Sequence, residues 1–139
     1  MMRCLVGDRV LVPSDLWMQT SSGLAFRPAA PSPAQIALVD IARGLANTAR
    51  YCGQTRRRYS VAEHSVHLAR WFLRNGTREQ AQIALMHDAA EAYICDIPRP
   101  LKVLLAPLYK PIEEAVEAAI AQRFGLPSLS DPAVKAADD

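Results

Sequence analysis

Residues 60–93, SVAEHSVHLARWFLRNGTREQAQIALMHDAAEAY, decide the fold because they hold two helix starts and one helix stop. Ser60 and Glu63 have the spacing of a capping box, in which each side chain bonds the backbone amide of the other residue. We therefore expect a helix over about 61–73. The Asn-Gly pair at 75–76 is typical of a helix end.

A second helix is expected directly after the first. The tetrad TREQ at 77–80 repeats the capping pattern, and the alanine-rich run behind it predicts a helix that ends near Tyr93. The stretch DIPRP at 96–100 then breaks the helix, since Pro98 and Pro100 cannot continue it.

Apolar periodicity predicts further helices on both sides of this pair. A broad apolar stripe over 33–50 indicates a buried helix, which Gly44 either weakens or allows to pack closely on a neighbour. An amphipathic helix is expected over about 110–124, closed by Gly125. Asp131-Pro132 has the pattern of an N-cap and first helical residue for a last helix.

Residues 1–34 differ from the rest, because they are rich in proline, serine and glycine. Short apolar stretches at 10–12 and 24–26 flank polar segments, and TSSG at 20–23 suits a tight turn. We expect a small β-hairpin or an extended arm here. The predicted fold class is all-α, with this arm followed by a helical bundle over 35–139.

Composition places the chain among single-domain globular proteins. It has 139 residues, of which 50% are hydrophobic and 22% charged, and its net charge of +2 gives no sign of a nucleic-acid polymer or a membrane surface as partner. Cys4, Cys52 and Cys95 are odd in number and widely spaced, which argues against a disulfide framework and favours a reducing cytoplasm. The N-terminal stretch lacks the pattern of a signal peptide.

Several polar side chains stand where helical packing favours apolar ones. Adjacent His87 and Asp88 project about 100° apart around a helix, so both reach one point from one side. Glu91 follows His87 by one helical turn, and His64 precedes an apolar stripe. Imidazole and carboxylate together suit Mn, Co, Fe, Zn or Mg. A cation would also offset the cost of burying Asp88 unpaired.

Each of these residues taken singly has an ordinary explanation. A lone histidine in a helix is usually a core or surface residue, and His67 is assigned no role on that ground. Glu91 and Asp96 could be solvated charges at a helix end, and the run at 56–58 is most simply an exposed basic loop. The combination of residues is what points to a site.

Three separated motifs carry a resemblance to a known family. YSVAEHS at 59–65, ALMHDAAEAYICDIPRPLK at 84–102 and VKAAD at 134–138 resemble the HD-domain phosphohydrolases. The branch of 5′-deoxynucleotidases and phage deoxynucleoside triphosphate hydrolases is the most similar, from about residue 35 onward. The resemblance implies an HD-domain helical bundle.

The resemblance also implies roles for individual residues. One divalent cation would be held by His64, His87, Asp88 and Asp138. Glu91 would orient or activate the attacking water, and Asp96 would assist by proton transfer. Arg50 and Lys102 would contact phosphate, and Tyr51 could stack on the base.

The C-terminus departs from the family pattern. In members of the family, a helix continues well past the last aspartate, whereas this chain ends one residue after Asp138. We therefore expect the C-terminal part of the bundle to be incomplete. Asp139 is an alternative ligand by proximity, but the KxAD spacing favours Asp138.

We expect a metal-dependent phosphohydrolase that acts on deoxynucleotides and releases phosphate from 5′-monophosphates. A deoxynucleoside triphosphate triphosphohydrolase is the alternative, and a regulatory module that binds metal and nucleotide without turnover is an alternative from another class. A guanosine tetraphosphate hydrolase would need a further carboxylate-rich motif and more length. A homo-oligomer, joined through the N-terminal arm, is also expected.

Overall fold

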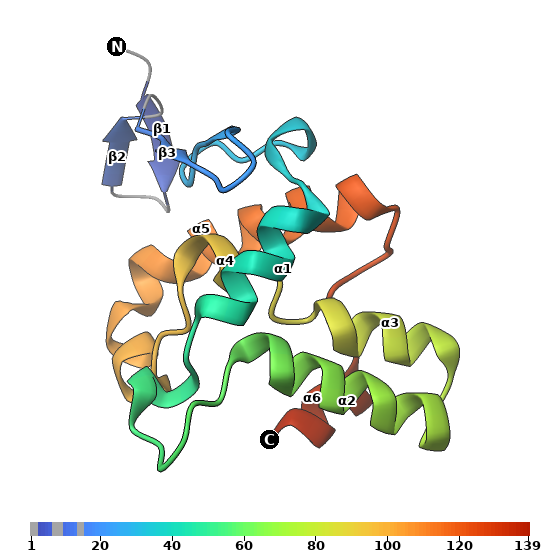
Figure 1. The fold of residues 1–139 in the computed structure, drawn as a ribbon. Coiled ribbons are helices and arrows are strands. Elements are labelled where there is room, and N and C mark those ends of the chain that lie inside the picture. The colour runs from blue at the N-terminus through green and yellow to red at the C-terminus, as the bar shows by residue number, and fades with distance from the viewer. Residues whose placement is uncertain (1–2, 7–9, 14–15) are drawn as a thin grey trace.

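The structure is a computed structural model that describes residues 3–6, 10–13 and 16–139, and it is mostly helical (Figure 1). The expected all-α class is confirmed. The helices are α1 (Leu38–Asn47), α2 (Val61–Asn75), α3 (Arg78–Met86), α4 (Glu91–Ile94), α5 (Arg99–Phe124) and α6 (Pro132–Asp138), with short 3₁₀ turns η1 (Pro33–Gln35) and η2 (Arg50–Gly53). No helix of the described part is long and apolar enough to cross a membrane.

The N-terminal arm forms two antiparallel hairpins. Strand β1 (Arg3–Val6) pairs with β2 (Val10–Pro13), and β3 (Met18–Gln19) pairs with β4 (Ala25–Phe26). The expected turn between β3 and β4 is confirmed, since Gly23 takes a φ of 89° and its amide donates to the Thr20 carbonyl. Of the three cysteines, the structure describes only the backbone of Cys4, while Cys52 and Cys95 are free thiols.

The β3–β4 turn is tied to α1 through the buried carboxylate of Asp40. This carboxylate accepts hydrogen bonds from the Ser21 hydroxyl and from the amide and hydroxyl of Ser22, each 2.7 Å long. Burial alone would raise the pKa of Asp40, but these hydrogen bonds outweigh it and lower the pKa. Phe26 at the end of the hairpin stacks on Tyr93 with ring centroids 4.4 Å apart, so the arm contributes to the main core.

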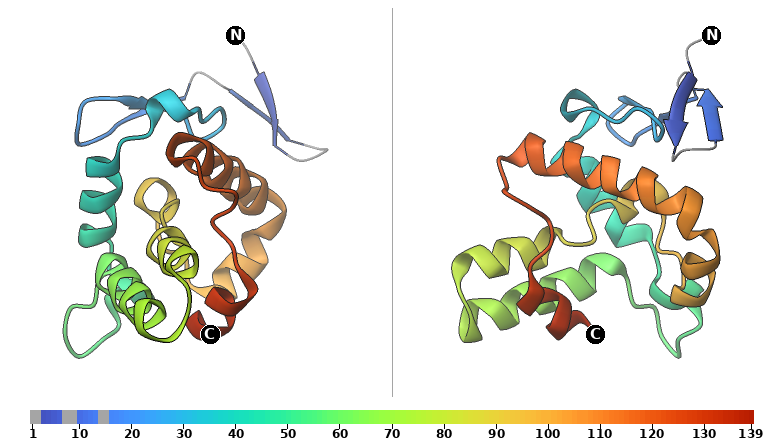
Figure 2. Two further views of the ribbon diagram at one scale, coloured as in Figure 1. Left: turned by 90° about the vertical axis from the view of Figure 1, so that its right-hand side faces the viewer. Right: turned by 180° about the vertical axis from the view of Figure 1, so that it is seen from behind.

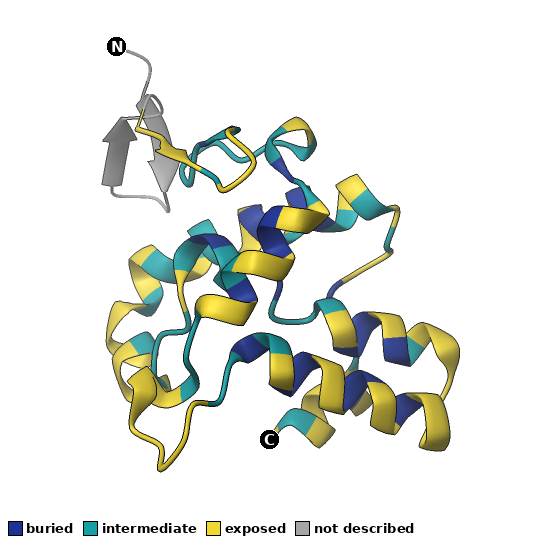
Figure 3. Cartoon of the chain, in the orientation of Figure 1, coloured by how far each residue is buried: buried dark blue, intermediate teal, exposed yellow. Residues whose placement is uncertain are grey.

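Helices α2 and α3 form a hairpin whose starts are those expected from the caps. The Ser60 hydroxyl accepts from the Glu63 amide, but the reciprocal half of that predicted capping box is not formed, and the Glu63 carboxylate lies 3.6 Å from His67 instead. Thr77 and Gln80 form a complete capping box. Buried and exposed residues alternate along both helices (Figure 3), which is the pattern of amphipathic helices packed on one side. The short α6 lies against this pair (Figure 2).

The helix expected to run on to Tyr93 is interrupted, so that prediction was wrong. Helix α3 ends at Met86, and the amides of Ala89 and Glu91 bond carbonyls only three residues back, as in a 3₁₀ helix. The reason is tertiary. Residues 81–84 pack into the core beneath α2, whereas residues 89–93 pack into the main core, and the chain turns between them.

Helix α5 begins at Arg99 rather than near residue 110, which corrects a second boundary. Pro107 and Pro111 lie inside this 26-residue helix and bend it rather than end it (Figure 2). The bend brings two distant residues of the helix together, so that Lys102 Nζ lies 2.5 Å from Glu113 Oε1. On a straight helix, eleven residues would separate their backbones by about 16 Å.

The other two helix ends follow the sequence. Gly125 closes α5 in the left-handed conformation, with a φ of 65°. The Asp131 carboxylate caps α6 by accepting from the amides of Ala133 and Val134. Both predictions are confirmed.

Gly44 allows α1 to lie directly against α4. A Cβ atom placed at this position would come within 2.8 Å of both the Cβ and the carbonyl oxygen of Ala92. The second of the two roles expected for Gly44, close packing on a neighbour, is therefore confirmed.

We expect Gly44→Ala to destabilise the fold by about 1–3 kcal/mol, because the backbone of α4 must move away. In an unobstructed helix interior the same change would stabilise by about 1 kcal/mol. Urea unfolding measures the difference. A gain in stability would contradict the close approach of the two helices.

Candidate metal centre and its clefts

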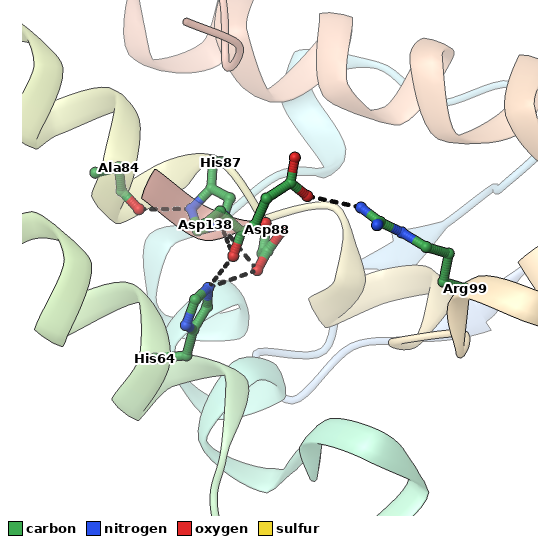
Figure 4. Close-up of polar contacts among 7 residues, drawn as sticks. His64, Ala84, His87, Asp88, Arg99 and Asp138 are labelled. Carbon is green, nitrogen blue, oxygen red and sulfur yellow. Dashed lines mark hydrogen bonds and ion pairs between the residues drawn. The ribbon is translucent and has the colours of Figure 1, made fainter. Parts of the chain in front are cut away.

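Four side chains from three parts of the chain meet at one point (Figure 4). They are His64 of α2, His87 and Asp88 of the turn after α3, and Asp138 at the end of α6. His64 Nε2 lies 2.7 Å from Asp138 Oδ1, and His87 Nε2 lies 3.0 Å from Asp88 Oδ2. The two remaining His–Asp distances in the cluster are each 3.7 Å. The structure thus brings together all four residues that the resemblance gave as ligands.

Local structure orients each histidine. The Nδ1 of His87 lies 2.6 Å from the carbonyl oxygen of Ala84. Since a carbonyl only accepts, Nδ1 carries the proton, and Nε2 presents its lone pair to the cluster. His64 stands in the first turn of α2, held by the Ser60 cap, with its ring 5.3 Å from that of His87.

The strongest sign of a cation site is a set of orphaned atoms. The Nε2 atoms of His64 and His87 and Oδ1 of Asp138 are buried and have no hydrogen-bond partner among the described residues. Their short mutual distances lack hydrogen-bond angles, and all three lie within 4.8 Å of one another. Buried polar atoms without partners are costly and rare. Two imidazole nitrogens and carboxylate oxygens that converge on one point fit a divalent transition metal.

The electrostatics of the cluster favour ligation. Burial and the charge of Arg50 outweigh the nearby carboxylates and lower the pKa of His64. Burial also acts to lower the pKa of His87, but the close Asp88 carboxylate, 3.0 Å away, raises it overall. The same pairing outweighs the effect of burial on Asp88 and lowers its pKa. Metal ligands must be deprotonated, so the lowered pKa values of His64 and Asp88 favour ligation, whereas His87 must release a proton that Asp88 helps to hold.

Glu91 and Asp96 stand beside the cluster with strongly perturbed acidity. Burial first, and then the charges of Asp88 and Asp96, raise the pKa of Glu91 to about 9. Burial is also the main cause that raises the pKa of Asp96. Both residues line a cleft of about 410 Å³. Carboxyl groups with raised pKa values in a cleft are candidates for proton transfer.

The same cleft brings together the residues expected to bind substrate, which are Arg50, Tyr51 and Lys102. The Arg50 guanidinium lies over the Tyr51 and Tyr59 rings, 5.1 and 5.7 Å from their centroids. Lys102 is engaged by Glu113, a partner that sequence reasoning missed. Glu113 and Glu117 are spaced i, i+4 in the sequence, which predicts that they share one face of a helix. This spacing does not predict that the bend in α5 brings Glu113 to Lys102.

Backbone strain is concentrated at Cys95, directly before Asp96. Cys95 has φ 71° and ψ 159°, a region that is populated almost only by glycine. The Tyr109 hydroxyl donates to the Cys95 carbonyl over 3.3 Å. Tyr51 and Cys52 also take left-handed conformations, with φ values of 55° and 52°. Two of the chain segments that form the cleft, at Tyr51–Cys52 and at Cys95–Asp96, thus contain unfavourable backbone conformations. Such strain is common at functional sites.

Glu117 gives a pH-dependent contribution to stability. Burial and the charge of Glu113 raise its pKa from 4.5 to about 7. A carboxyl whose pKa is raised on folding loses stability as pH rises from its unfolded value through its folded one. We therefore expect the free energy of unfolding of Glu117→Gln to exceed that of the wild type by an amount that grows between about pH 4.5 and 7 and is constant above pH 7. Urea unfolding across this range measures it. Glu114→Gln, at an exposed position of α5, is the control, and an equal gain there would contradict the prediction.

The fold is all-α, and comparisons with known proteins show the family of the chain. The chain is 42% identical over 122 residues to the uncharacterized protein YfdR of Escherichia coli, covering 88% of this chain and 66% of YfdR. It is 40% identical over 131 residues to an uncharacterized protein of Rhodobacter capsulatus, covering 88% and 67%. The chain belongs to the family of these two proteins and spans about two thirds of their length. No family model matches it.

Proposed function

We propose that this chain is a metal-dependent phosphohydrolase of the HD-domain superfamily that releases phosphate from deoxynucleoside 5′-monophosphates. One observation carries the proposal: three orphaned buried atoms, from His64, His87 and Asp138, converge beside a cleft with cationic side chains. Residues so distant in sequence are brought to one point by three separate elements.

The donor set supports one divalent cation, held by His64, His87, Asp88 and Asp138. Such a cation supplies positive charge that neutralises phosphate oxygens and makes water more acidic. The remaining chemistry belongs to the protein side chains around the cleft.

Arg50 binds the phosphate in this proposal. Its guanidinium lines the cleft and lies over the Tyr51 and Tyr59 rings, and its fork of donors can bond two phosphate oxygens at once. Lys102 adds a second positive charge to the same cleft, and its pairing with Glu113 offsets part of that charge.

Glu91 and Asp96 divide the proton transfers. With the positive charge of the cation beside it, Glu91 returns to its carboxylate form and then accepts a proton from the attacking water as the water oxygen bonds to phosphorus. The phosphorus–oxygen ester bond breaks, and Asp96 gives its proton to the departing 5′-oxygen. The raised pKa of Asp96 favours the protonated carboxyl that this role needs.

The test is a panel of deoxynucleoside monophosphates, ribonucleoside monophosphates and deoxynucleoside triphosphates with Mn²⁺, Co²⁺ or Mg²⁺, assayed for phosphate and for triphosphate. We expect phosphate from the deoxynucleoside monophosphates. Arg50→Ala should raise KM strongly, whereas Arg57→Ala, in the exposed loop before α2, is its matched control. Release of triphosphate, or tight nucleotide binding without turnover, would contradict the proposal.

A further inference from the structure

Among the described residues, three cavities meet at the cluster, and their walls differ in chemistry. One of about 400 Å³ is lined mostly by charged side chains, namely seven carboxylates and the lysines at 102, 110 and 135. The second, of about 410 Å³, is also mostly charged, with Arg50, Arg99 and Lys102 beside five carboxylates. The third, of about 830 Å³, lies between α2 and α6 and is walled mainly by aromatic and aliphatic groups.

The third cavity is a slot with one aromatic and one small-residue wall. His64, Leu68 and Trp71 follow one another along a single face of α2, because their spacing matches successive helical turns. Alanines of α6 at 133, 136 and 137 form the opposite wall. Their single methyl groups leave room between the two helices.

We propose that this slot between α2 and α6 binds the heterocyclic base of the nucleotide, stacked on Trp71. The inference rests on the proposed function and adds the base subsite to it. Trp71 is 47% exposed, so a large part of its indole is open to contact. It lies seven residues after His64, a rise of about 10 Å along the helix, which matches the reach from a 5′-phosphate to its base.

The other two cavities are less suited to a base. Both are walled mostly by charged side chains, which give a flat ring little apolar surface to stack on. The second also holds Arg50 and Lys102, whose donors suit phosphate oxygens. Arg50 and Tyr51 line both the cationic cleft and the aromatic slot, so a ligand can place its phosphate in one and its base in the other.

The slot also predicts weak discrimination among bases. Stacking accepts any flat ring, and the gain grows with ring area. Apart from His64, His67 is the polar side chain of α2 that lines the slot, and its Nε2 lies 3.6 Å from Glu63 Oε1. The slot therefore offers few polar groups that could distinguish one base from another. We therefore expect purine nucleotides to bind more tightly than pyrimidine nucleotides, without strict selection.

The chain offers a direct reporter, since it has two tryptophans, Trp17 and Trp71. Trp17→Phe leaves Trp71 as the only source of indole fluorescence. A second change, Glu91→Gln, prevents turnover during the titration. With Mg²⁺ present, deoxyadenosine 5′-monophosphate should quench this fluorescence, whereas 2-deoxyribose 5-phosphate, which lacks the base, should bind without quenching it.

Calorimetry on variants tests the energetics. Trp71→Ala should weaken deoxyadenosine monophosphate binding by about tenfold or more, and Trp71→Phe should retain most of it. Ala133→Leu should also weaken it by narrowing the slot. None of these changes should alter 2-deoxyribose 5-phosphate binding by more than about twofold. Trp17→Ala, at an exposed position of the arm, is the matched control.

Two outcomes would overturn the inference in different ways. If the nucleotide binds but neither quenches Trp71 nor loses affinity in Trp71→Ala, the base lies elsewhere, and only the subsite is wrong. If neither phosphate compound binds, the proposed function itself fails and the base subsite fails with it.

Discussion

Asp138→Ala should lose about 100-fold or more of the affinity for Mn²⁺ and nearly all phosphatase activity, because it removes one of the converging ligands. Asp139→Ala should keep both. The two aspartates are adjacent, yet they have different partners: Asp138 Oδ1 lies 2.7 Å from His64 Nε2, whereas Asp139 pairs with Arg99 at the surface (Figure 4). An exposed pair of that kind contributes little to stability.

Calorimetry with Mn²⁺ and a thermal-shift titration measure the outcome. A cation that binds only the folded state raises the Tm of the wild type and of Asp139→Ala, but not that of Asp138→Ala. Circular dichroism confirms that each variant folds. If Asp139→Ala loses the cation instead, Asp139 is the ligand, and the assignment of Asp138 is wrong.

Glu91→Gln should reduce kcat by about 10²–10⁴-fold while the cation remains bound, since glutamine keeps the shape of the side chain but cannot accept a proton. Glu63→Gln, an exposed glutamate in the first turn of α2, is the control. A loss of bound Mn²⁺ equal to the loss of rate would show that Glu91 is a ligand rather than a base.

The acidity of Glu91 adds a second readout. Without a cation its pKa is raised to about 9, so it is protonated at neutral pH. Positive charge placed beside it favours the carboxylate, and cation binding then releases a proton. The affinity of the wild type should therefore rise with pH up to about 9, and more steeply than that of Glu91→Gln. Calorimetry in buffers of different ionisation enthalpy counts the protons, and equal counts in both proteins would contradict this.

Much of the fold was predictable because its boundaries are set by local chemistry. Ser60, Thr77 and Asp131 cap their helices with hydroxyl or carboxylate oxygens, and Gly125 ends α5 in a conformation that disfavours other residues. Such signals act within four residues and can be read without knowledge of the tertiary structure.

Boundaries that depend on distant packing were not predictable. The turn at 87–90 forms because the alanines before it pack in one core and Ala89 and Ala90 within it pack in the other, although alanine itself favours helix equally at each place. Prolines normally end helices, yet Pro107 and Pro111 lie inside α5, where residues such as Val116 and Ile120 anchor its C-terminal half in the main core.

The same distinction applies to the site. The motif order predicted which residues to look for, and the structure places His64, His87, Asp88 and Asp138 together. The pairing of Lys102 with Glu113 follows from the bend in α5, and the aromatic slot follows from where α6 packs. Neither arrangement has a signature in a short stretch of sequence.

The strained backbone at Cys95 and the buried acid at Glu91 bear on any attempt to engineer this protein. A glycine at 95 relieves the conformation, and a neutral residue at 91 removes a carboxyl that burial and neighbouring charges disfavour. Selection for thermal resistance alone will therefore enrich substitutions around the cleft that erase its chemistry. A library screened for heat tolerance should hold these two positions fixed, or be counter-selected for cation binding in every round.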